Sequence, residues 1–204
     1  MEKVLDLGCG TGDSWHSLRL PVEGRAVVGI DIQMDRLRAA NLKYAERGWR
    51  YLCARGENIP LPDASLNGVF SEVAVPYMHI PRMLAELHRV LVPGGWLRAT
   101  LHAPGFTWRE LRNAFPRPKP TFFRIFVMLN GVVLHLTGNV MSLGNKAESC
   151  QTETGMRIAL KRAGFDSIRF DHDGLRFFLS ARRNDTTQTS AAAPTSTAAS
   201  VSVN

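Results

Sequence analysis

The chain has 204 residues, of which 45% are hydrophobic and 21% charged, and its formal net charge is +7. This size and composition predict one globular domain with a sizeable core, and they exclude a wholly disordered or fibrous chain. The positive charge favours an anionic partner, although an ordinary solvated surface can carry the same excess.

Targeting signals and cysteine spacing set the expected compartment. The chain has no uninterrupted apolar run of about 18 residues, so we expect no transmembrane helix. Its N-terminus lacks the charged, apolar and small-residue order of a secretory signal. Cys9, Cys53 and Cys150 are too scattered for a disulfide framework, and none of them pairs at metal-site spacing. We therefore expect a reduced, cytoplasmic protein without a metal site.

Short apolar segments alternate with amphipathic ones from the N-terminus onward. The expected strands lie at 4–7, 26–30, 51–54, 68–71 and 96–101, and the expected helices at 33–47 and 80–91. A further helix at 156–163 precedes two closing strands at 168–170 and 177–179. This alternation predicts a mostly parallel sheet with helices on both faces. Ligands of such sheets bind beyond the carboxyl ends of the strands.

An insertion at 103–150 separates the fifth strand from the final helix. It begins with aromatic residues interleaved with Arg and Lys, and continues as a largely apolar stretch. Three uses remain open: a pocket for a small molecule, a surface that binds nucleic acid, and a helical pair that completes the core. The apolar stretch also suits peripheral contact with a membrane. Residues 184–204 have little charge and no apolar period, so we expect a disordered tail after a domain at 1–183.

A glycine-rich loop follows the first strand. Gly8, Gly10 and Gly12 let the backbone approach a ligand that a Cβ atom would obstruct. A dinucleotide fingerprint requires glycine where Asp13 stands, and a carboxylate there would repel a pyrophosphate. Dinucleotide binding is therefore the weaker interpretation of this loop.

Four segments carry a family resemblance: VLDLGCGTG, GIDIQMDRL, GENIPLPDASLNGVF and LHRVLVPGGWL. In this order they resemble the motifs of class I S-adenosylmethionine-dependent methyltransferases, especially the small-molecule branch that includes ubiquinone and menaquinone biosynthesis enzymes. The resemblance covers Val4 to about Leu101. It implies an α/β, Rossmann-like fold with a seven-stranded, mostly parallel sheet. The family normally has helices before the first strand, so we expect these N-terminal helices to be missing here and a helical insertion to follow strand five.

The resemblance also implies S-adenosylmethionine as cofactor and assigns it eight binding residues. Asp6 would order the loop, the three glycines would line the methionine end, Asp31 would accept both ribose hydroxyls, Ile32 would pack on adenine, and Gly56 and Glu57 would lie at the adenine edge. Arg55 stands where the family usually has an aspartate for the adenine amine, and arginine cannot accept that hydrogen bond.

Catalysis requires a group near the strand ends. His79 and His102 follow the fourth and fifth strands and are the candidate catalytic bases, because histidine exchanges a proton near neutral pH. Capping or solvation is the alternative role for each. The sequence thus predicts a methyltransferase for a small, apolar or aromatic acceptor. The alternatives are an RNA methyltransferase that uses the basic-aromatic insertion, and a non-catalytic binding module. No stable protein partner is inferred.

Overall fold

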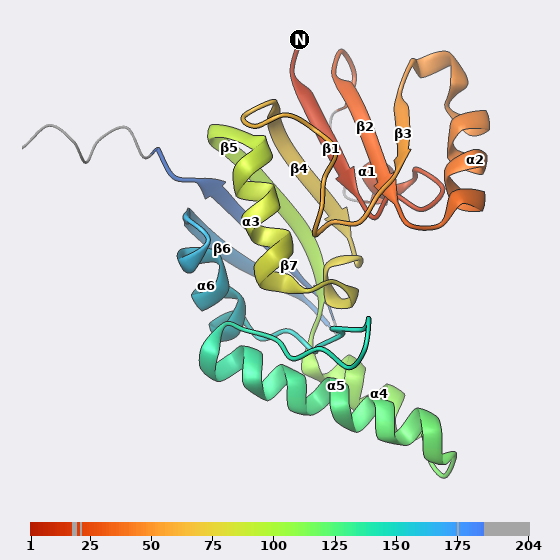
Figure 1. Cartoon of the computed structure of the whole chain (residues 1–204), viewed down its shortest axis with the longest axis vertical. Coiled ribbons are helices and arrows are strands. Elements are labelled where there is room, and N and C mark those ends of the chain that lie inside the picture. The colour runs from red at the N-terminus through yellow and green to blue at the C-terminus, as the bar shows by residue number, and fades with distance from the viewer. Residues whose placement is uncertain (18–19, 21, 175, 186–204) are drawn as a thin grey trace, which may run out of the picture.

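A seven-stranded sheet forms the centre of the protein, for which a computed structural model describes residues 1–17, 20, 22–174 and 176–185. The predicted tail at 184–204 lies almost wholly outside these residues. Figure 1 shows the strands in the order β3-β2-β1-β4-β5-β7-β6. Their bounds are β1 Lys3–Leu7, β2 Ala26–Asp31, β3 Arg50–Cys53, β4 Leu66–Glu72, β5 Leu91–His102, β6 Phe165–Asp173 and β7 Arg176–Arg183. Strands β1 to β5 are mutually parallel and β7 is antiparallel to both its neighbours, so the predicted fold class is confirmed.

The helices alternate with the strands as the sequence predicts. Their bounds are α1 Ser14–Ser17, α2 Met34–Lys43, α3 Ile80–Val90, α4 Pro104–Ala114, α5 Pro118–Thr137 and α6 Glu153–Arg162, with short 3₁₀ turns at Ala45–Arg47 and Val75–Tyr77. The segment expected as one helix at 33–47 is α2 followed by the first 3₁₀ turn. This turn ends at Gly48, whose left-handed φ of +64° suits a residue without a Cβ atom.

The two faces of the sheet carry different cores. Because neighbouring strand residues point to opposite faces, Leu5 and Leu7 join the larger cluster with α3 and α6, whereas Val4 joins the smaller cluster on the other face. The smaller cluster is rich in aromatic rings, among them Trp15 and Trp49. Both faces are thus covered by apolar side chains, which leaves the strand ends as the exposed edge available to a ligand.

Strand β5 is longer than predicted, because it begins at Leu91 and not at 96. Leu66 of β4 pairs with Leu91, but Gly68 pairs with Trp96, so the residues between Leu91 and Trp96 form an irregularity within the strand. Gly94 adopts a left-handed φ of +72° there. The Pro-Gly-Gly sequence that indicates a break between helix and strand instead lies in a bulge of the strand itself.

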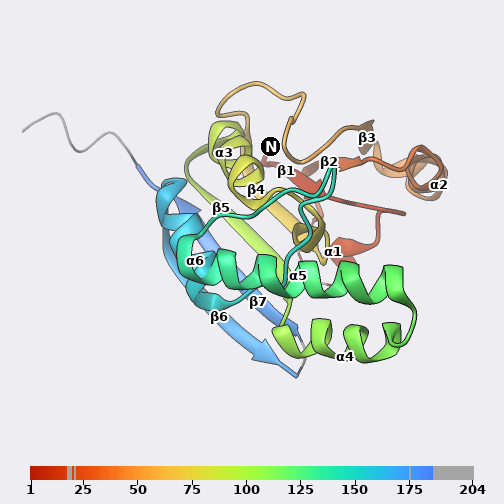
Figure 2. The ribbon, with the colours of Figure 1, turned by 60° about the horizontal axis from the view of Figure 1, so that its bottom comes forward.

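The insertion forms an antiparallel pair of helices, α4 and α5, beyond the carboxyl ends of the strands (Figures 1 and 2). Within the described residues, α5 is the one helix whose length and mean hydropathy of 1.3 would suffice to cross a membrane, although only 22% of its apolar stretch is buried. It meets this measure despite Arg124 and Asn130, which interrupt the apolar run in the sequence. Length and composition alone do not place it in a membrane, since core helices of soluble proteins meet the same measure.

Candidate functional site

A cavity of about 560 Å³ lies where β1, β2 and β4 end. This volume is typical of small-molecule sites, which span roughly 300–1,000 Å³. The residues that line it are Gly8, Ile30, Asp31, Ile32, Gln33, Arg36, Ala54, Arg55, Gly56, Glu57, Glu72, Val73, Ala74, Tyr77 and Met78. Five of the predicted cofactor-binding residues are therefore brought together here: Gly8, Asp31, Ile32, Gly56 and Glu57.

The three loop glycines serve different contacts. Gly8 lines the cavity with φ at +72°, and a Cβ atom on it would lie 2.2 Å from the Cβ atom of Ala74. Gly10 and Gly12 are not among the lining residues. A Cβ atom on Gly12 would lie 2.9 Å from the hydroxyl of Tyr51, so this glycine gives room to an aromatic ring. Of the three glycines that the sequence predicts to line the ligand, Gly8 is the one that lies at the cavity wall.

Asp31, the last residue of β2, is held by the backbone on both sides. Its Oδ2 accepts a hydrogen bond from the Gly10 N–H at 3.0 Å, and its Oδ1 accepts one from the Gln33 N–H at 2.8 Å. Each carboxylate oxygen can accept a further bond. Next to it, the Ile32 side chain is 62% exposed, so an apolar surface borders a carboxylate that is oriented for two donors. A ribose beside an adenine ring matches this pair of features.

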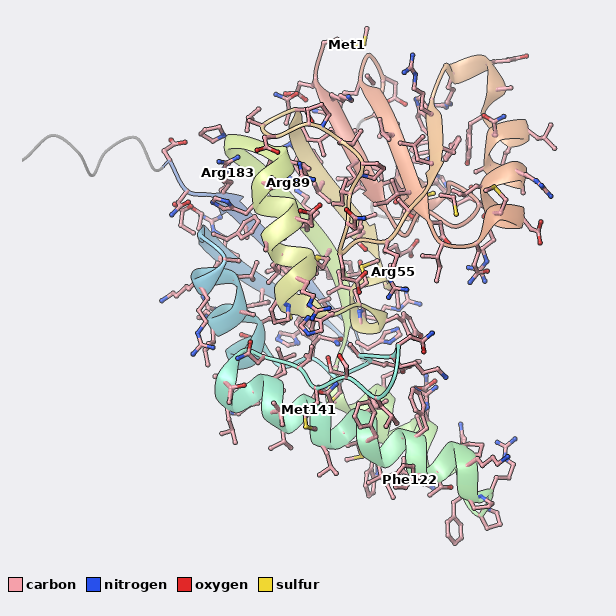
Figure 3. All side chains as sticks on the ribbon, in the orientation of Figure 1. Met1, Arg55, Arg89, Phe122, Met141 and Arg183 are labelled. Atoms are coloured by element: carbon pink, nitrogen blue, oxygen red, sulfur yellow. The ribbon has the colours of Figure 1, made fainter. Side chains whose placement is uncertain are left out.

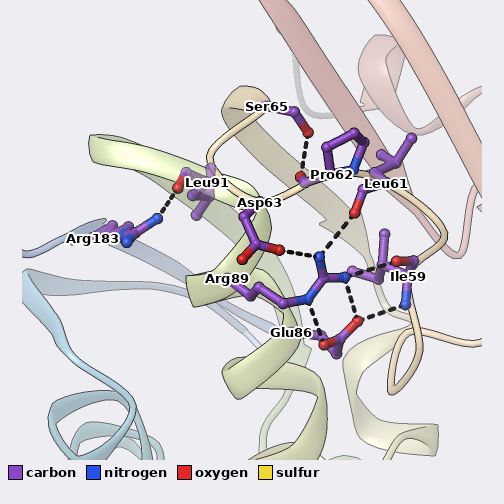
Figure 4. Close-up of polar contacts among 9 residues, drawn as sticks. All are labelled: Ile59, Leu61, Pro62, Asp63, Ser65, Glu86, Arg89, Leu91 and Arg183. Atoms are coloured by element: carbon purple, nitrogen blue, oxygen red, sulfur yellow. Dashed lines mark hydrogen bonds and ion pairs between the residues drawn. The ribbon is translucent and has the colours of Figure 1, made fainter.

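The loop after β3 carries Gly56 and Glu57 and is anchored to α3 (Figure 4). Arg89 donates hydrogen bonds to the carbonyl oxygens of Ile59 at 2.8 Å and Leu61 at 2.9 Å, and it also pairs with Asp63 and Glu86. Glu86 in turn accepts a bond from the Ile59 N–H at 2.8 Å. These bonds fix the backbone of the loop at Ile59 and Leu61, neither of which lines the cavity.

The carboxylate of Glu57 has partners within the protein. Its Oε1 accepts a hydrogen bond from the His79 N–H at 2.8 Å, and its Oε2 lies 3.5 Å from Nε of Arg55. Glu57 thereby connects the loop after β3 to the segment after β4. Arg55, the departure from the family pattern, lines the cavity as an arginine paired with this carboxylate.

Asp6 lies behind the cavity wall. It is 2% exposed, and its Oδ1 has no hydrogen-bond partner among the described residues. Burial, together with the acidic neighbours Glu72 and Asp31 and against a lowering hydrogen bond with Ser14, raises the pKa of Asp6 to about 8. Asp6 is therefore largely protonated at neutral pH, and it can order the loop as a neutral group.

Neither predicted catalytic histidine is among the residues that line the cavity. The ring of His79 has a buried Nδ1 with no hydrogen-bond partner in the described structure. The ring of His102 stacks on Phe106 at 3.9 Å between centroids, and burial, followed by the charges of Arg176 and Arg109, lowers its pKa. A neutral imidazole is the form that accepts a proton. The catalytic role of both histidines stays a prediction.

Two ionisable residues do line the cavity here: Glu72, which ends β4, and Tyr77, which follows it. Burial raises the pKa of Tyr77, and the charges of Glu148 and Glu110 raise it further, so its hydroxyl is neutral at neutral pH. Their only signal in the sequence is position, since Glu72 ends the strand that reaches the cavity and Tyr77 lies in the segment after it. That position does not reveal which side chains turn inward.

The insertion adjoins the mouth of the cavity. The Ser149 N–H donates to the carbonyl of Pro76 at 3.2 Å, which places the loop after α5 against the turn that carries Tyr77. Arg124 of α5 pairs with Glu110 of α4 and with Glu148 of that loop. These ion pairs join the three parts of the insertion beside the cavity. Over the described range, no group of three or more His, Cys, Asp or Glu residues could hold a metal ion.

Comparisons with known proteins agree with this geometry. Residues 5–99 match the family described as a methyltransferase domain. The chain is 36% identical over 115 residues to malonyl-[acyl-carrier protein] O-methyltransferase of Serratia marcescens. The aligned region covers 56% of this chain and 43% of that protein. It is 29% identical over 178 residues to demethylmenaquinone methyltransferase of Thermus thermophilus, covering 83% of this chain and 76% of that protein.

Solved structures show the same fold. A S-adenosylmethionine-dependent methyltransferase of Methanosarcina mazei superposes with a TM-score of 0.61 at 19% identity, covering 90% of this chain and 92% of the other. A second structure, described as an S-adenosylmethionine-dependent methyltransferase of Listeria monocytogenes, superposes with a TM-score of 0.63 at 18% identity and covers 90% of each chain.

Residues 5–99 therefore match a methyltransferase domain, which bears out the resemblance carried by the four motifs. The chain spans less than half the length of the malonyl-[acyl-carrier protein] enzymes that it matches. Their substrates are thus properties of those proteins.

Proposed function

We propose that this protein transfers a methyl group from S-adenosylmethionine to a small, apolar or aromatic acceptor. The observation that carries the proposal is the position of Asp31, a carboxylate held by Gly10 and Gln33 at the rim of a 560 Å³ cavity that Gly8 leaves open. The family relationship supports the reaction class, and the relatives named for small-molecule or carrier-bound substrates support the kind of acceptor.

The residues present fit the cofactor. Asp31 would hold the ribose hydroxyls, Ile32 would pack on the adenine, and Gly56 and Glu57 would border its edge. In the loop after β1, Gly8 would border the methionine end, while Gly10 and Gly12 of that loop and Asp6 of β1 do not line the cavity. Three carboxylates line the cavity against two guanidinium groups, Arg36 and Arg55, and this acidic excess suits a cationic sulfonium. The bound cofactor supplies the methyl group, and the protein supplies proximity and orientation.

The acceptor would lie between the end of β4 and the insertion. Val73, Ala74 and Met78 give this wall of the cavity an apolar lining, which supports an apolar acceptor. His102 and His79 are proposed as bases that reach the acceptor when it is bound; the neutral state of His102 supports its assignment. Because Cys9, Cys53 and Cys150 are free thiols, the proposal includes a cytoplasmic location.

Calorimetric titration with S-adenosylmethionine tests the proposal. We expect one molecule to bind per chain, with displacement by S-adenosylhomocysteine, and methyl transfer from labelled cofactor to aromatic or lipophilic test acceptors. Absence of binding at millimolar cofactor contradicts the proposal. Binding without transfer to any acceptor favours the non-catalytic module.

An RNA methyltransferase is the second candidate. The exposed side chains of Trp108, Arg109, Arg112 and Phe115 on and beside α4 favour it, because bases stack on aromatic rings and phosphates bind arginine. RNA affinity would then fall steeply with added salt. Transfer of label to RNA in preference to small acceptors would establish this candidate over the first.

A further inference from the structure

Helix α5 presents an exposed row of apolar side chains. Phe122, Ile125, Leu129, Val132 and Leu136 follow one another at alternating spacings of three and four residues, so they share one side of the helix. Their exposed fractions run from 43% for Ile125 to 70% for Leu136. Figure 3 shows Phe122 on the hairpin far from the sheet. We call these five residues the apolar row. A contiguous exposed row of this kind indicates an interaction surface.

The opposite side of α5 is fixed to the protein. Val127, Gly131 and Leu134 are buried, and a Cβ atom on Gly131 would lie 2.0 Å from the Cys150 sulfur. Asn130 is fully buried; its amide donates to the carbonyl oxygens of Met141 at 3.0 Å and Glu148 at 2.9 Å. These contacts keep the helix alongside the domain, so it cannot cross a bilayer without losing them. The apolar row remains directed outward.

Positive charge is concentrated on α4 and at the N-terminal end of α5, next to the start of the apolar row. Residues 104–137 contain five Arg or Lys residues and one acidic residue, Glu110, which is paired with Arg124. The other four cations, Arg109, Arg112, Arg117 and Lys119, are exposed. Trp108 and Phe115 add exposed aromatic rings at 54% and 73%. Aromatic and aliphatic side chains bordered by Arg and Lys are typical of helices that lie in the interface of a membrane.

We infer that the apolar row and these four cations bind the surface of an anionic lipid bilayer, with α5 lying in the plane of the interface. Charge complementarity favours an anionic bilayer over a second copy of the chain as the partner of this surface. A second copy of the chain packed on the same row would bring two cationic hairpins together, whereas anionic headgroups neutralise them. Because the loop after α5 contacts Pro76 beside the cavity, the docked protein would hold the cavity mouth near the bilayer. The inference does not depend on methyl transfer.

Sedimentation with vesicles tests the inference. We expect the full chain to bind vesicles of phosphatidylcholine mixed with phosphatidylglycerol, and to bind pure phosphatidylcholine at least tenfold more weakly. Added salt should weaken the binding, since it screens charges beyond about 10 Å at 0.1 M. Equal binding to both vesicles, or no binding to either, overturns the inference.

Matched double variants locate the surface. Leu129→Gln with Leu136→Gln, and Arg117→Gln with Lys119→Gln, should each reduce vesicle partitioning about tenfold or more. The controls are Met34→Gln with Leu42→Gln on α2 and Arg50→Gln with Arg82→Gln, which change other exposed residues elsewhere and should bind as the unmodified chain does. Thermal unfolding confirms that each variant is folded. If the control variants lose as much vesicle partitioning as the test variants, the inference is overturned.

The same variants also test two other partners for this surface, a second copy of the chain and RNA. Sedimentation equilibrium without vesicles should show a monomer for the unmodified chain. A dimer that the Leu129→Gln, Leu136→Gln variant converts to a monomer identifies the apolar row as a contact between copies, and overturns lipid docking. Binding of single-stranded RNA that abolishes vesicle binding and is lost with Arg117→Gln, Lys119→Gln assigns the cations to RNA, and likewise overturns it.

Discussion

The backbone N–H of Gly10 donates to Oδ2 of Asp31 at 3.0 Å, which joins the loop after β1 to the end of β2. These two strands are parallel neighbours, with Leu7 paired to Ile30, so the loop and the carboxylate emerge side by side at the same edge of the sheet. The hydrogen bond orients the carboxylate before any ligand arrives. This preorganisation lowers the entropic cost of binding.

Replacing Asp31 with alanine should weaken S-adenosylmethionine binding about tenfold or more. The change removes a charged acceptor of two hydroxyl groups, each bond being worth about 1.5 kcal/mol or more. Calorimetry on the variant measures the loss. Asp35→Ala is the control, because the Asp35 side chain is 95% exposed on α2 and pairs only at the surface with Arg38. Unchanged affinity in Asp31→Ala would contradict the ribose assignment.

Gly8→Ala should disrupt the cavity, whereas Gly24→Ala should leave it intact. The two glycines have nearly the same left-handed φ, +72° and +71°, so both variants place alanine at a φ that L residues rarely adopt. A Cβ atom on Gly8 would lie 2.2 Å from that of Ala74, but one on Gly24 would meet nothing within 4 Å. We expect Gly8→Ala to lose roughly 1–3 kcal/mol more stability than Gly24→Ala in urea unfolding, and to bind the cofactor more weakly. Equal losses would show that crowding at Ala74 does not matter.

Much of the fold could be predicted from sequence because its signals are local. The strand that runs into Gly8, and the helical period of α3, each depend on residues close in the chain. The start of β5 was missed because Gly94, which indicates a stop, can equally form a bulge once β4 provides the pairing partner. Such partners are determined by the tertiary structure.

The candidate site was predictable by position but not by side-chain direction. Asp31 lies where the end of β2 places it, whereas Gly12 faces Tyr51 and His102 stacks on Phe106. Spacing along a loop does not determine which residue turns toward the cavity. Likewise, the sequence of α5 shows apolar residues on more than one side, and only packing reveals that the row with Leu129 is exposed.

Arg89→Met should destabilise the protein and loosen the loop that carries Glu57. The variant loses the bonds to the carbonyl oxygens of Ile59 and Leu61 and leaves Glu86 without its cation. Since Arg89 is 32% exposed, solvent screening limits the expected loss to about 2 kcal/mol. Urea unfolding measures it, with Arg82→Met on the exposed side of α3 as control. If both variants unfold at the same urea concentration, the loop does not depend on this anchor.

The buried carboxyl group of Asp6 should make stability depend on pH. Burial raises its pKa from the usual 3.8 to about 8, so between these values the unfolded chain releases a proton that the folded chain retains. The free energy of unfolding should therefore fall as the pH rises from about 4 to 8, by an amount on the order of a few kcal/mol. Asp6→Asn cannot ionise and should flatten this part of the profile, whereas Asp35→Asn should follow the unmodified chain. Urea unfolding without cofactor at about pH 5 and pH 8 measures the difference. Parallel profiles for the unmodified chain and Asp6→Asn would mean that Asp6 is ionised in the folded state, and that it orders the glycine loop as an anion.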